Sequence, residues 1–251
     1  MKLHHTAYKK SVLKFSHGNA KLSKDTLIFN LPAGHTCPFA KACLSKANRI
    51  TGKITDGKHA EYRCYAATSE SAFKNTREAR WHNFELLRHL DFEGMVKIIQ
   101  ESLDAINLNN IKLIRIHESG DFFNQDYFDA FLAVAANNPS KIFYAYTKSI
   151  QYWQARRDVI PTNFKITGSF GGRQDATLIK HKLKSNTVVF SEQEAKEKKL
   201  KIDHNDQLAW KQDESFAILL HGTQPKGSEA AQAIKAMKSQ GTSFSYGKGN
   251  R

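Results

Sequence analysis

The feature that most constrains the fold is a regular alternation between short apolar segments and amphipathic ones. Apolar or β-branched runs occupy residues 26–31, 111–116, 142–146, 164–167, 187–190 and 216–220. Such runs are typical of strands buried on both faces of a sheet. Between them, apolar side chains repeat at helical spacing, most clearly over residues 128–135 and 230–237. The alternation predicts an α/β fold with a parallel sheet of about six strands, and leaves open whether that sheet is flat or curled into a barrel.

The remaining segments are less regular. We expect helices between the first and second strands, starting at Ser69 and interrupted at Gly94. Residues 196–214 are rich in charge and predict a helix with a surface excursion. The glycine- and cation-containing end, residues 241–251, predicts a flexible tail on a single domain spanning residues 1–251.

Charge restricts the partners more than it restricts the chemistry. The chain has 38 Lys and Arg against 24 Asp and Glu, a formal net charge of +14 over 251 residues. This excess favours a nucleic acid or a phosphorylated small molecule as partner, with a generally basic, solubilising surface as the alternative. No apolar run is long enough to cross a bilayer and no apolar leader precedes the first strand, which predicts a cytoplasmic protein without a membrane partner.

All three cysteines lie within 28 residues, in a loop of residues 32–68 after the first strand. Three cysteines are too few for a disulfide scaffold, so we interpret Cys37, Cys43 and Cys64 as ligands of a shared metal group. They can hold three irons of a four-iron, four-sulfur (4Fe-4S) cluster and leave the fourth iron open. Alternatively, His59 completes a C-x5-C-x15-H-x4-C set for tetrahedral zinc.

Polar side chains follow every predicted strand, where ligands gather in parallel α/β folds. The second strand is followed by His117-Glu118-Ser119-Gly120-Asp121, and the fourth by Ser169 to Arg173. Asp121 is a candidate nucleophile or base that His117 would orient, or alternatively the N-cap of the next helix.

The position of the cysteine loop resembles that of radical S-adenosylmethionine enzymes, although the spacing here is C-x5-C-x20-C rather than C-x3-C-x2-C. Ser119-Gly120-Asp121 is similar in position to their Gly-Gly-Glu element. The resemblance implies a partial (β/α)6 TIM-like barrel with a 4Fe-4S cluster and S-adenosylmethionine. It also implies that Glu118 and Asp121 hold the methionine end of that cofactor, and that Ser169 and Arg173 meet its ribose and carboxylate.

A second resemblance rests on specific sequence words. Residues 29–40 with Cys43, Arg63-Cys64-Tyr65-Ala66, residues 80–84, residues 115–122 and Tyr146-Thr147-Lys148-Ser149 are similar to the phage "gene product 88" type of protein. This similarity covers roughly residues 26–173. It implies a phage-associated protein, acting in the host cytoplasm, and it supplies no reaction.

Three hypotheses follow. The first is an iron–sulfur enzyme of the radical S-adenosylmethionine type that acts on a nucleotide or nucleic acid. The second is a nucleic-acid-binding protein without catalysis, in which zinc bound by Cys37, Cys43, His59 and Cys64 has a structural role. The third is a base-exchanging transglycosylase barrel with Asp121 as its nucleophile.

Overall fold

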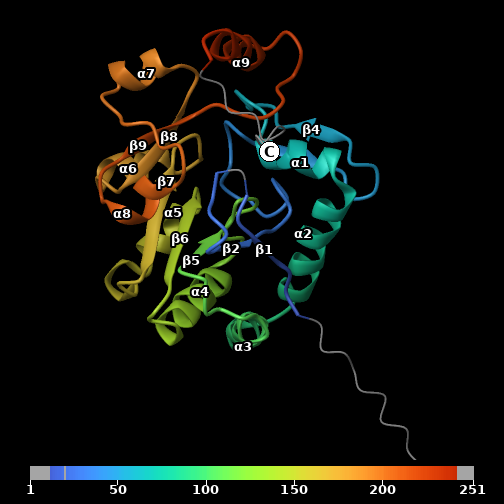
Figure 1. Cartoon of the computed structure of the whole chain (residues 1–251), viewed down its shortest axis with the longest axis vertical. Helices are drawn as coiled ribbons and strands as arrows, with labels where there is room; N and C mark the ends of the chain where they lie inside the picture. Colours follow the sequence, from blue (N-terminus) through green and yellow to red (C-terminus); the bar gives the residue numbers. More distant parts are fainter. Residues whose placement is uncertain (1–11, 20, 242–251) are drawn as a thin grey trace, which may run out of the picture.

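A computed structural model describes residues 12–19 and 21–241 and centres on a seven-stranded sheet (Figure 1). In sheet order the strands are β1 (Phe15–His17), β2 (Thr26–Phe29), β5 (Leu113–Ile116), β6 (Ile142–Thr147), β7 (Phe164–Ser169), β8 (Ser185–Val189) and β9 (Phe216–Leu219). Only β1 runs antiparallel to its neighbour. The predicted six parallel strands are therefore confirmed, and they follow one another across the sheet in chain order.

The sheet is not closed. In the described part of the chain β1 and β9 form its two edges and do not pair with each other. The added edge strand, β1, has only three residues, too few to show an apolar pattern in the sequence. The strand order is that of a singly wound sheet, because no reversal of order interrupts it.

Nine α-helices and one 3-10 helix connect the described strands. The first crossover contains α1 (Tyr65–Ala72), α2 (Lys74–Leu87) and α3 (Phe92–Asp104), preceded by a small hairpin of β3 (Ser45–Ala47) and β4 (Ile54–Asp56). The later elements are α4 (Gln125–Asn137), α5 (Ile150–Gln154), η1 (Arg157–Val159), α6 (Asp175–Lys180), α7 (Glu192–Glu197), α8 (Gln207–Lys211) and α9 (Glu229–Ser239).

Two predicted helix boundaries in the first crossover are wrong. The first helix starts at Tyr65, with Cys64 at its N-cap, so Ser69 lies in mid-helix. Gly94 does not interrupt a helix but sits in the first turn of α3, where its N–H donates to Asp91 Oδ1 at 2.9 Å. A glycine is tolerated there because the capping carboxylate, rather than the side chain, fixes the first turn.

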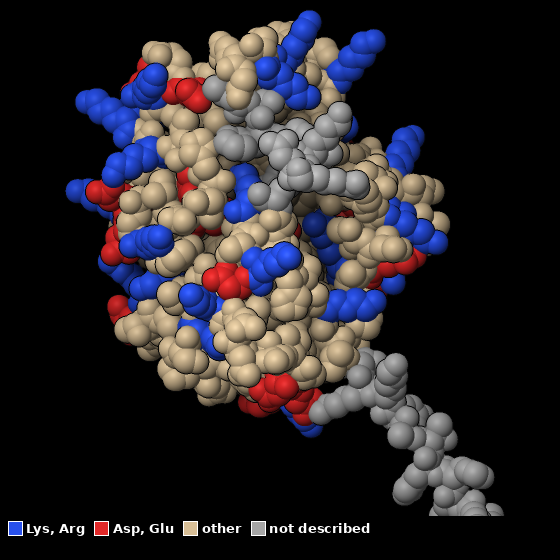
Figure 2. All heavy atoms as spheres, viewed as in Figure 1, with Lys and Arg blue, Asp and Glu red and all other residues tan. Residues whose placement is uncertain are grey.

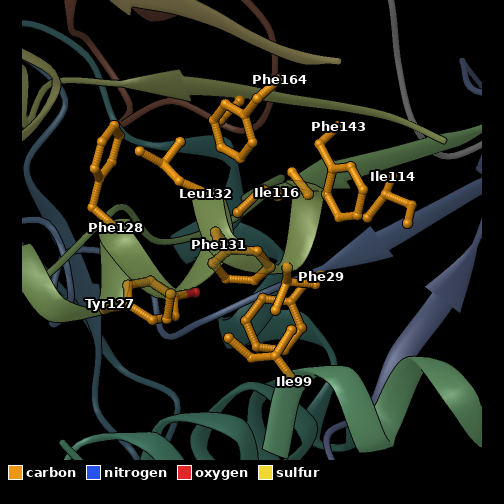
Figure 3. Packing of buried hydrophobic residues seen from close by; sticks show 14 of the residues in the cluster. Phe29, Ile99, Ile114, Ile116, Tyr127, Phe128, Phe131, Leu132, Phe143 and Phe164 are labelled. Atoms are coloured by element: carbon orange, nitrogen blue, oxygen red, sulfur yellow. The ribbon is translucent and has the colours of Figure 1, made fainter. Parts of the chain in front are cut away.

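The main core lies between the sheet and α3 and α4 (Figure 3). Alternate strand residues such as Phe29, Ile116 and Phe143 point to this face and are fully buried. Phe131 of α4 packs on Phe29 with 5.6 Å between ring centroids. This packing fixes one face of the strands, so the intervening residues must point to the other face.

The opposite, concave face is covered at its lower end by α8. Leu208 and Trp210 of this helix pack around a small cluster that contains Leu113, Tyr144 and Phe216, all near the amino ends of their strands. Residues 196–214 are therefore not only a surface excursion. Their charge content concealed a short apolar helix that closes the base of the sheet.

On the face shown in Figure 2, basic side chains are scattered rather than gathered in one stripe. No helix of the described residues has the length and apolarity needed to cross a membrane. The predicted tail, apart from Gly241, lies outside the described residues.

We expect Phe131→Ala to lower the free energy of unfolding by about 3–5 kcal/mol, because it leaves a large cavity between sheet and helices. Phe73→Ala is the matched control, since Phe73 is 62% exposed between α1 and α2, and it should change stability by no more than about 0.5 kcal/mol. Urea unfolding monitored by circular dichroism measures both. Equal losses in the two variants would contradict this assignment of the core.

Candidate functional site

A pocket lies at the carboxyl ends of the parallel strands, beneath the cysteine loop. Its cavity volume is about 170 Å³, within a wider hollow of about 880 Å³ that is partly open to solvent. Its wall combines residues from the loop and α1 with residues from five strands or the segments that follow them. They include Cys37, Cys43, Tyr62, Cys64, Tyr65, Arg115, His117, Glu118, Ser119, Gly120, Asp121, Tyr146, Lys148, Ser169, Asn186, Val188, Ile218, Leu220 and His221.

All three cysteines line this one pocket, although 20 residues separate Cys43 from Cys64. The long spacing does not separate them in space because the intervening residues fold outward as the β3–β4 hairpin and return. The return is fixed by Glu61 and Tyr62, whose N–H groups donate to the Ala42 carbonyl at 2.7 and 3.2 Å.

The cysteine loop is attached to the strand ends that it crosses. Next to Cys43, the N–H of Ala42 donates to the Gly171 carbonyl after β7 at 2.9 Å. Gly171 has a φ of +88°, and a Cβ there would lie 2.9 Å from the Ala42 Cβ, so the close contact requires glycine. Next to Cys64, Gln224 after β9 accepts from the Arg63 N–H at 2.7 Å. The loop therefore spans the mouth of the sheet.

The surroundings of Cys37 and Cys64 oppose the ionisation of their thiols. Burial raises the pKa of Cys64 to about 11, against the opposing effect of the Ala66 and Ala67 N–H groups at the start of α1. Burial, followed by the charges of Asp121 and of the other two cysteines, raises the pKa of Cys37 well above its usual range. Ionising several thiols here thus requires a compensating positive charge, such as a metal group provides.

A buried carboxylate, Glu70 of α1, anchors the start of the loop. Glu70 Oε1 accepts from the Ala33 N–H at 2.8 Å, from Arg80 Nη1 at 3.0 Å and from Ser119 Oγ at 3.2 Å. Neither Glu70 nor Arg80 is more than 5% exposed. Glu70 therefore joins the cysteine loop, the end of β5 and helix α2 through one side chain.

Asp121 faces the pocket, but its carboxylate is already engaged. Oδ1 accepts from the Phe122 N–H at 2.8 Å and from Thr147 Oγ1 at 2.6 Å, and Oδ2 accepts from the Lys148 N–H at 2.8 Å. Burial nevertheless raises the pKa of Asp121 to about 6. The N-cap of α4 is Asn124 instead. Asp121 thus links the ends of β5 and β6, a role that leaves it poorly suited to nucleophilic attack.

The neighbours of Asp121 have separate roles. Ser119 Oγ donates to the Leu31 carbonyl at 2.8 Å, and Glu118 Oε1 accepts from Asn19 Nδ2 at 2.7 Å. Gly120 has a φ of +88°, and a Cβ there would lie 2.7 Å from both Leu31 Cβ and Thr36 Oγ1. A glycine at position 120 is therefore required for the close packing of this segment against Leu31 and Thr36.

His117 is buried at the end of β5 with a left-handed φ of 69°. Burial, followed by the charge of Arg115, lowers the pKa of His117 to about 3, so the ring is neutral at physiological pH. Its Nε2 pairs with the Tyr127 hydroxyl at 2.9 Å. A neutral, strained histidine facing a pocket is typical of a functional site.

Two predicted site residues lie elsewhere. Arg173 and His59 are exposed, and neither lines the pocket. The backbone of Arg173 instead helps to hold the cysteine loop, since its N–H donates to the Phe39 carbonyl at 2.8 Å. Ser169 does line the pocket, and its Oγ accepts from Lys148 Nζ at 2.7 Å.

Comparisons with known proteins identify the family. The family model described as gene product 88 matches residues 11–240. The chain belongs to the gene product 88 family. It is 33% identical over 138 residues to the Gene 88 protein of Mycobacterium phage L5 and 31% identical over 138 residues to that of Mycobacterium phage D29. Each match covers 52% of this chain, which spans about half the length of these relatives. No solved structure matches the chain.

The gene product 88 resemblance seen in the sequence is thus confirmed, and the phage origin of both relatives supports the predicted phage association. The comparisons give no support to the radical S-adenosylmethionine resemblance, which stays a prediction.

Arg115 and Asn186 of this gene product 88 protein were not predicted as site residues, and Tyr146 and Lys148 entered the sequence analysis only as part of a sequence word. Arg115 pairs with Asp206 at 2.5 Å on the concave face, and Tyr146 and Asn186 lie on neighbouring parts of that face. Lys148 donates to the Ser169 and Phe170 carbonyls as well as to Ser169 Oγ. The available signal was a charge inside an apolar strand, as in Ile-Arg-Ile over residues 114–116.

We expect Glu70→Ala to lower the free energy of unfolding by about 3–5 kcal/mol, because Arg80 would be left buried without its partner. Glu78→Ala is the control, since Glu78 forms a surface pair with Lys74 and should contribute no more than about 1 kcal/mol. Should Glu70→Ala fail to fold, Glu70→Gln keeps an acceptor and gives a measurable intermediate loss. A cost below about 1 kcal/mol for Glu70→Ala would contradict the anchoring role.

We also expect a specific pH dependence from Asp121. Its folded-state pKa lies above the ordinary value, so its protonated form stabilises the fold at low pH, and this contribution is lost as pH rises through about 6. The stability of the wild type relative to Asp121→Asn should therefore fall between pH 4 and pH 7, by on the order of 2–3 kcal/mol. Urea unfolding of both proteins across this range tests it, and a constant difference would contradict it.

Proposed function

We propose that this gene product 88 protein is an iron–sulfur enzyme resembling radical S-adenosylmethionine enzymes, acting in the host cytoplasm on a nucleotide or nucleic-acid substrate. One observation carries the proposal: all three cysteines of the chain line a single pocket at the carboxyl ends of the parallel strands. In this proposal the open sheet serves as part of a TIM-like (β/α)6 barrel, with the cysteine loop across its mouth.

The ligand set favours a cluster over a single zinc ion. A structural zinc needs four ligands directed at one point. Among the described residues no group of three or more His, Cys, Asp and Glu side chains, the three cysteines included, is placed to hold a metal ion. His59, the fourth zinc ligand of the alternative, is exposed outside the pocket. A four-iron cluster instead binds each thiolate to a different iron, so Cys37, Cys43 and Cys64 need only surround a common space.

The surroundings fit a cofactor of this kind. When bound, such a cluster with S-adenosylmethionine supplies one-electron chemistry. Glu118 is the better candidate for the ammonium of the methionine end, because Asp121 is engaged by three donors of the chain itself. Lys148 and Ser169 form a polar edge of the pocket on the β7 side. Arg173 has no part in this site.

The substrate class rests on charge. A formal net charge of +14 attracts polyanions and phosphorylated molecules, and the basic side chains of the face in Figure 2 are distributed over it rather than concentrated. This distribution favours long-range attraction over one narrow binding track. The substrate would enter the pocket after such an encounter.

Anaerobic reconstitution with iron and sulfide tests the proposal. We expect about four irons per chain in the wild type and their loss, with the visible absorbance, in Cys37→Ser, Cys43→Ser and Cys64→Ser. His59→Ala is the matched control and should bind iron as the wild type does. Retention of one zinc per chain, lost in His59→Ala, would instead establish the structural zinc alternative. Circular dichroism verifies that each variant folds.

A further inference from the structure

The concave floor beneath the cysteines carries polar atoms that the protein leaves unused. Arg115 Nε, Tyr146 Oη and Asn186 Oδ1 are buried, line the pocket and have no hydrogen-bond partner within the described part of the chain. Leaving such buried atoms without partners is energetically unfavourable. His117 Nδ1, at the edge of the same pocket, is a fourth such atom in the described residues. Together these atoms indicate that the occupant of the pocket supplies the missing partners.

The strand register places these atoms on one surface. Arg115 is on β5 beside Tyr144, and Tyr146 follows two residues later on β6, pointing to the same face. Asn186 on β8 pairs with Ser169, another residue of the pocket wall. Arg115, Tyr146 and Asn186 thus form a floor of strand residues. Side chains on strands are held more rigidly than side chains on loops, so they position a bound group more accurately.

The chemistry of the floor is mixed rather than anionic or cationic. Arg115 Nε is a donor, Asn186 Oδ1 is an acceptor, and the Tyr146 hydroxyl can act as either. The charge of Arg115 is already balanced by Asp206 at 2.5 Å, and the guanidinium stacks over the Tyr146 ring at 5.2 Å. A phosphate would find no unpaired charge among these three side chains, so they are poorly suited to bind one.

Apolar side chains complete the lining on the far side of this floor. Val188, Ile218 and Leu220, from β8, β9 and the residue after β9, line the same pocket. An apolar wall beside a row of in-plane donors and acceptors fits a flat ring with polar atoms along its edge. A sugar, whose hydroxyl groups point in all directions, does not match this division.

We propose that the floor formed by Arg115, Tyr146 and Asn186 binds the edge of a substrate nucleobase that carries an exocyclic amino group. The amino group donates to Asn186 Oδ1, while ring acceptors of the base receive hydrogen bonds from Tyr146 and Arg115. This assignment deepens the proposed function and rests on it for the nucleotide nature of the substrate.

Two matched ligand pairs test the assignment by isothermal titration calorimetry: cytidine against uridine, and adenosine against inosine. Each pair differs at the position that carries the amino group. We expect the amino-bearing member to bind at least about tenfold more tightly, the effect of one hydrogen bond that a buried acceptor would otherwise lack. Asn186→Leu should abolish this preference, and Tyr146→Phe should weaken both members of each pair.

The control variant is Thr187→Val, which changes the neighbouring residue of β8 outside the pocket wall and should leave every Kd unchanged. Absence of nucleoside binding, equal binding within both pairs, or equal binding of ribose 5-phosphate would overturn the assignment. So would competitive displacement of cytidine by S-adenosylmethionine, because the floor would then hold the cofactor. Measuring iron in the same samples keeps the two proposals separate: nucleoside binding without a cluster contradicts only the iron–sulfur function.

Discussion

The architecture of the pocket depends on one buried carboxylate. Glu70 receives hydrogen bonds from the first part of the cysteine loop, from the end of β5 and from Arg80 of α2. A charge with no exposure to solvent is tolerated only when its partners are fixed. The contacts made by Glu70 Oε1 therefore hold the start of the cysteine loop and the residues after β5 at the same edge of the sheet. The position of the pocket residues at this edge thus depends on the fixed partners that Glu70 of α1 requires.

The parallel sheet could be predicted because its strands are buried on both faces and so appear as continuous apolar runs. The same reasoning could not find β1, whose three residues lie at an edge, or the curvature and openness of the sheet, which depend on side-chain packing between distant segments. It also missed the role of α8. The alternation of charged and apolar residues around Leu208 and Trp210 resembles a surface helix until the concave face that it covers is known.

The candidate site was predictable where chemistry and chain position coincide, and not where packing decides. The cysteines and residues 117–121 meet because each follows a parallel strand or crosses the strand ends. Arg173 satisfies the same rule of position, but its side chain is exposed and only its backbone contacts the cysteine loop. Gly120 is required by contacts with Leu31 and Thr36. Arg115, Tyr146 and Asn186 lie inside strands, where the sequence pattern indicates only burial.

The ion pair between Arg115 and Asp206 connects the base of the sheet with the pocket. Asp206 immediately precedes α8 and adopts a left-handed φ of 63°, a conformation that the surrounding contacts must stabilise. Helix α8 thus covers the amino ends of the strands. Asp206, at its start, also balances the charge of Arg115 on the pocket floor. With the base covered in this way, a ligand reaches the floor from the side of the cysteine loop. A group held by Cys37, Cys43 and Cys64, as proposed above, would therefore have to leave that passage open or bind after the ligand beneath it.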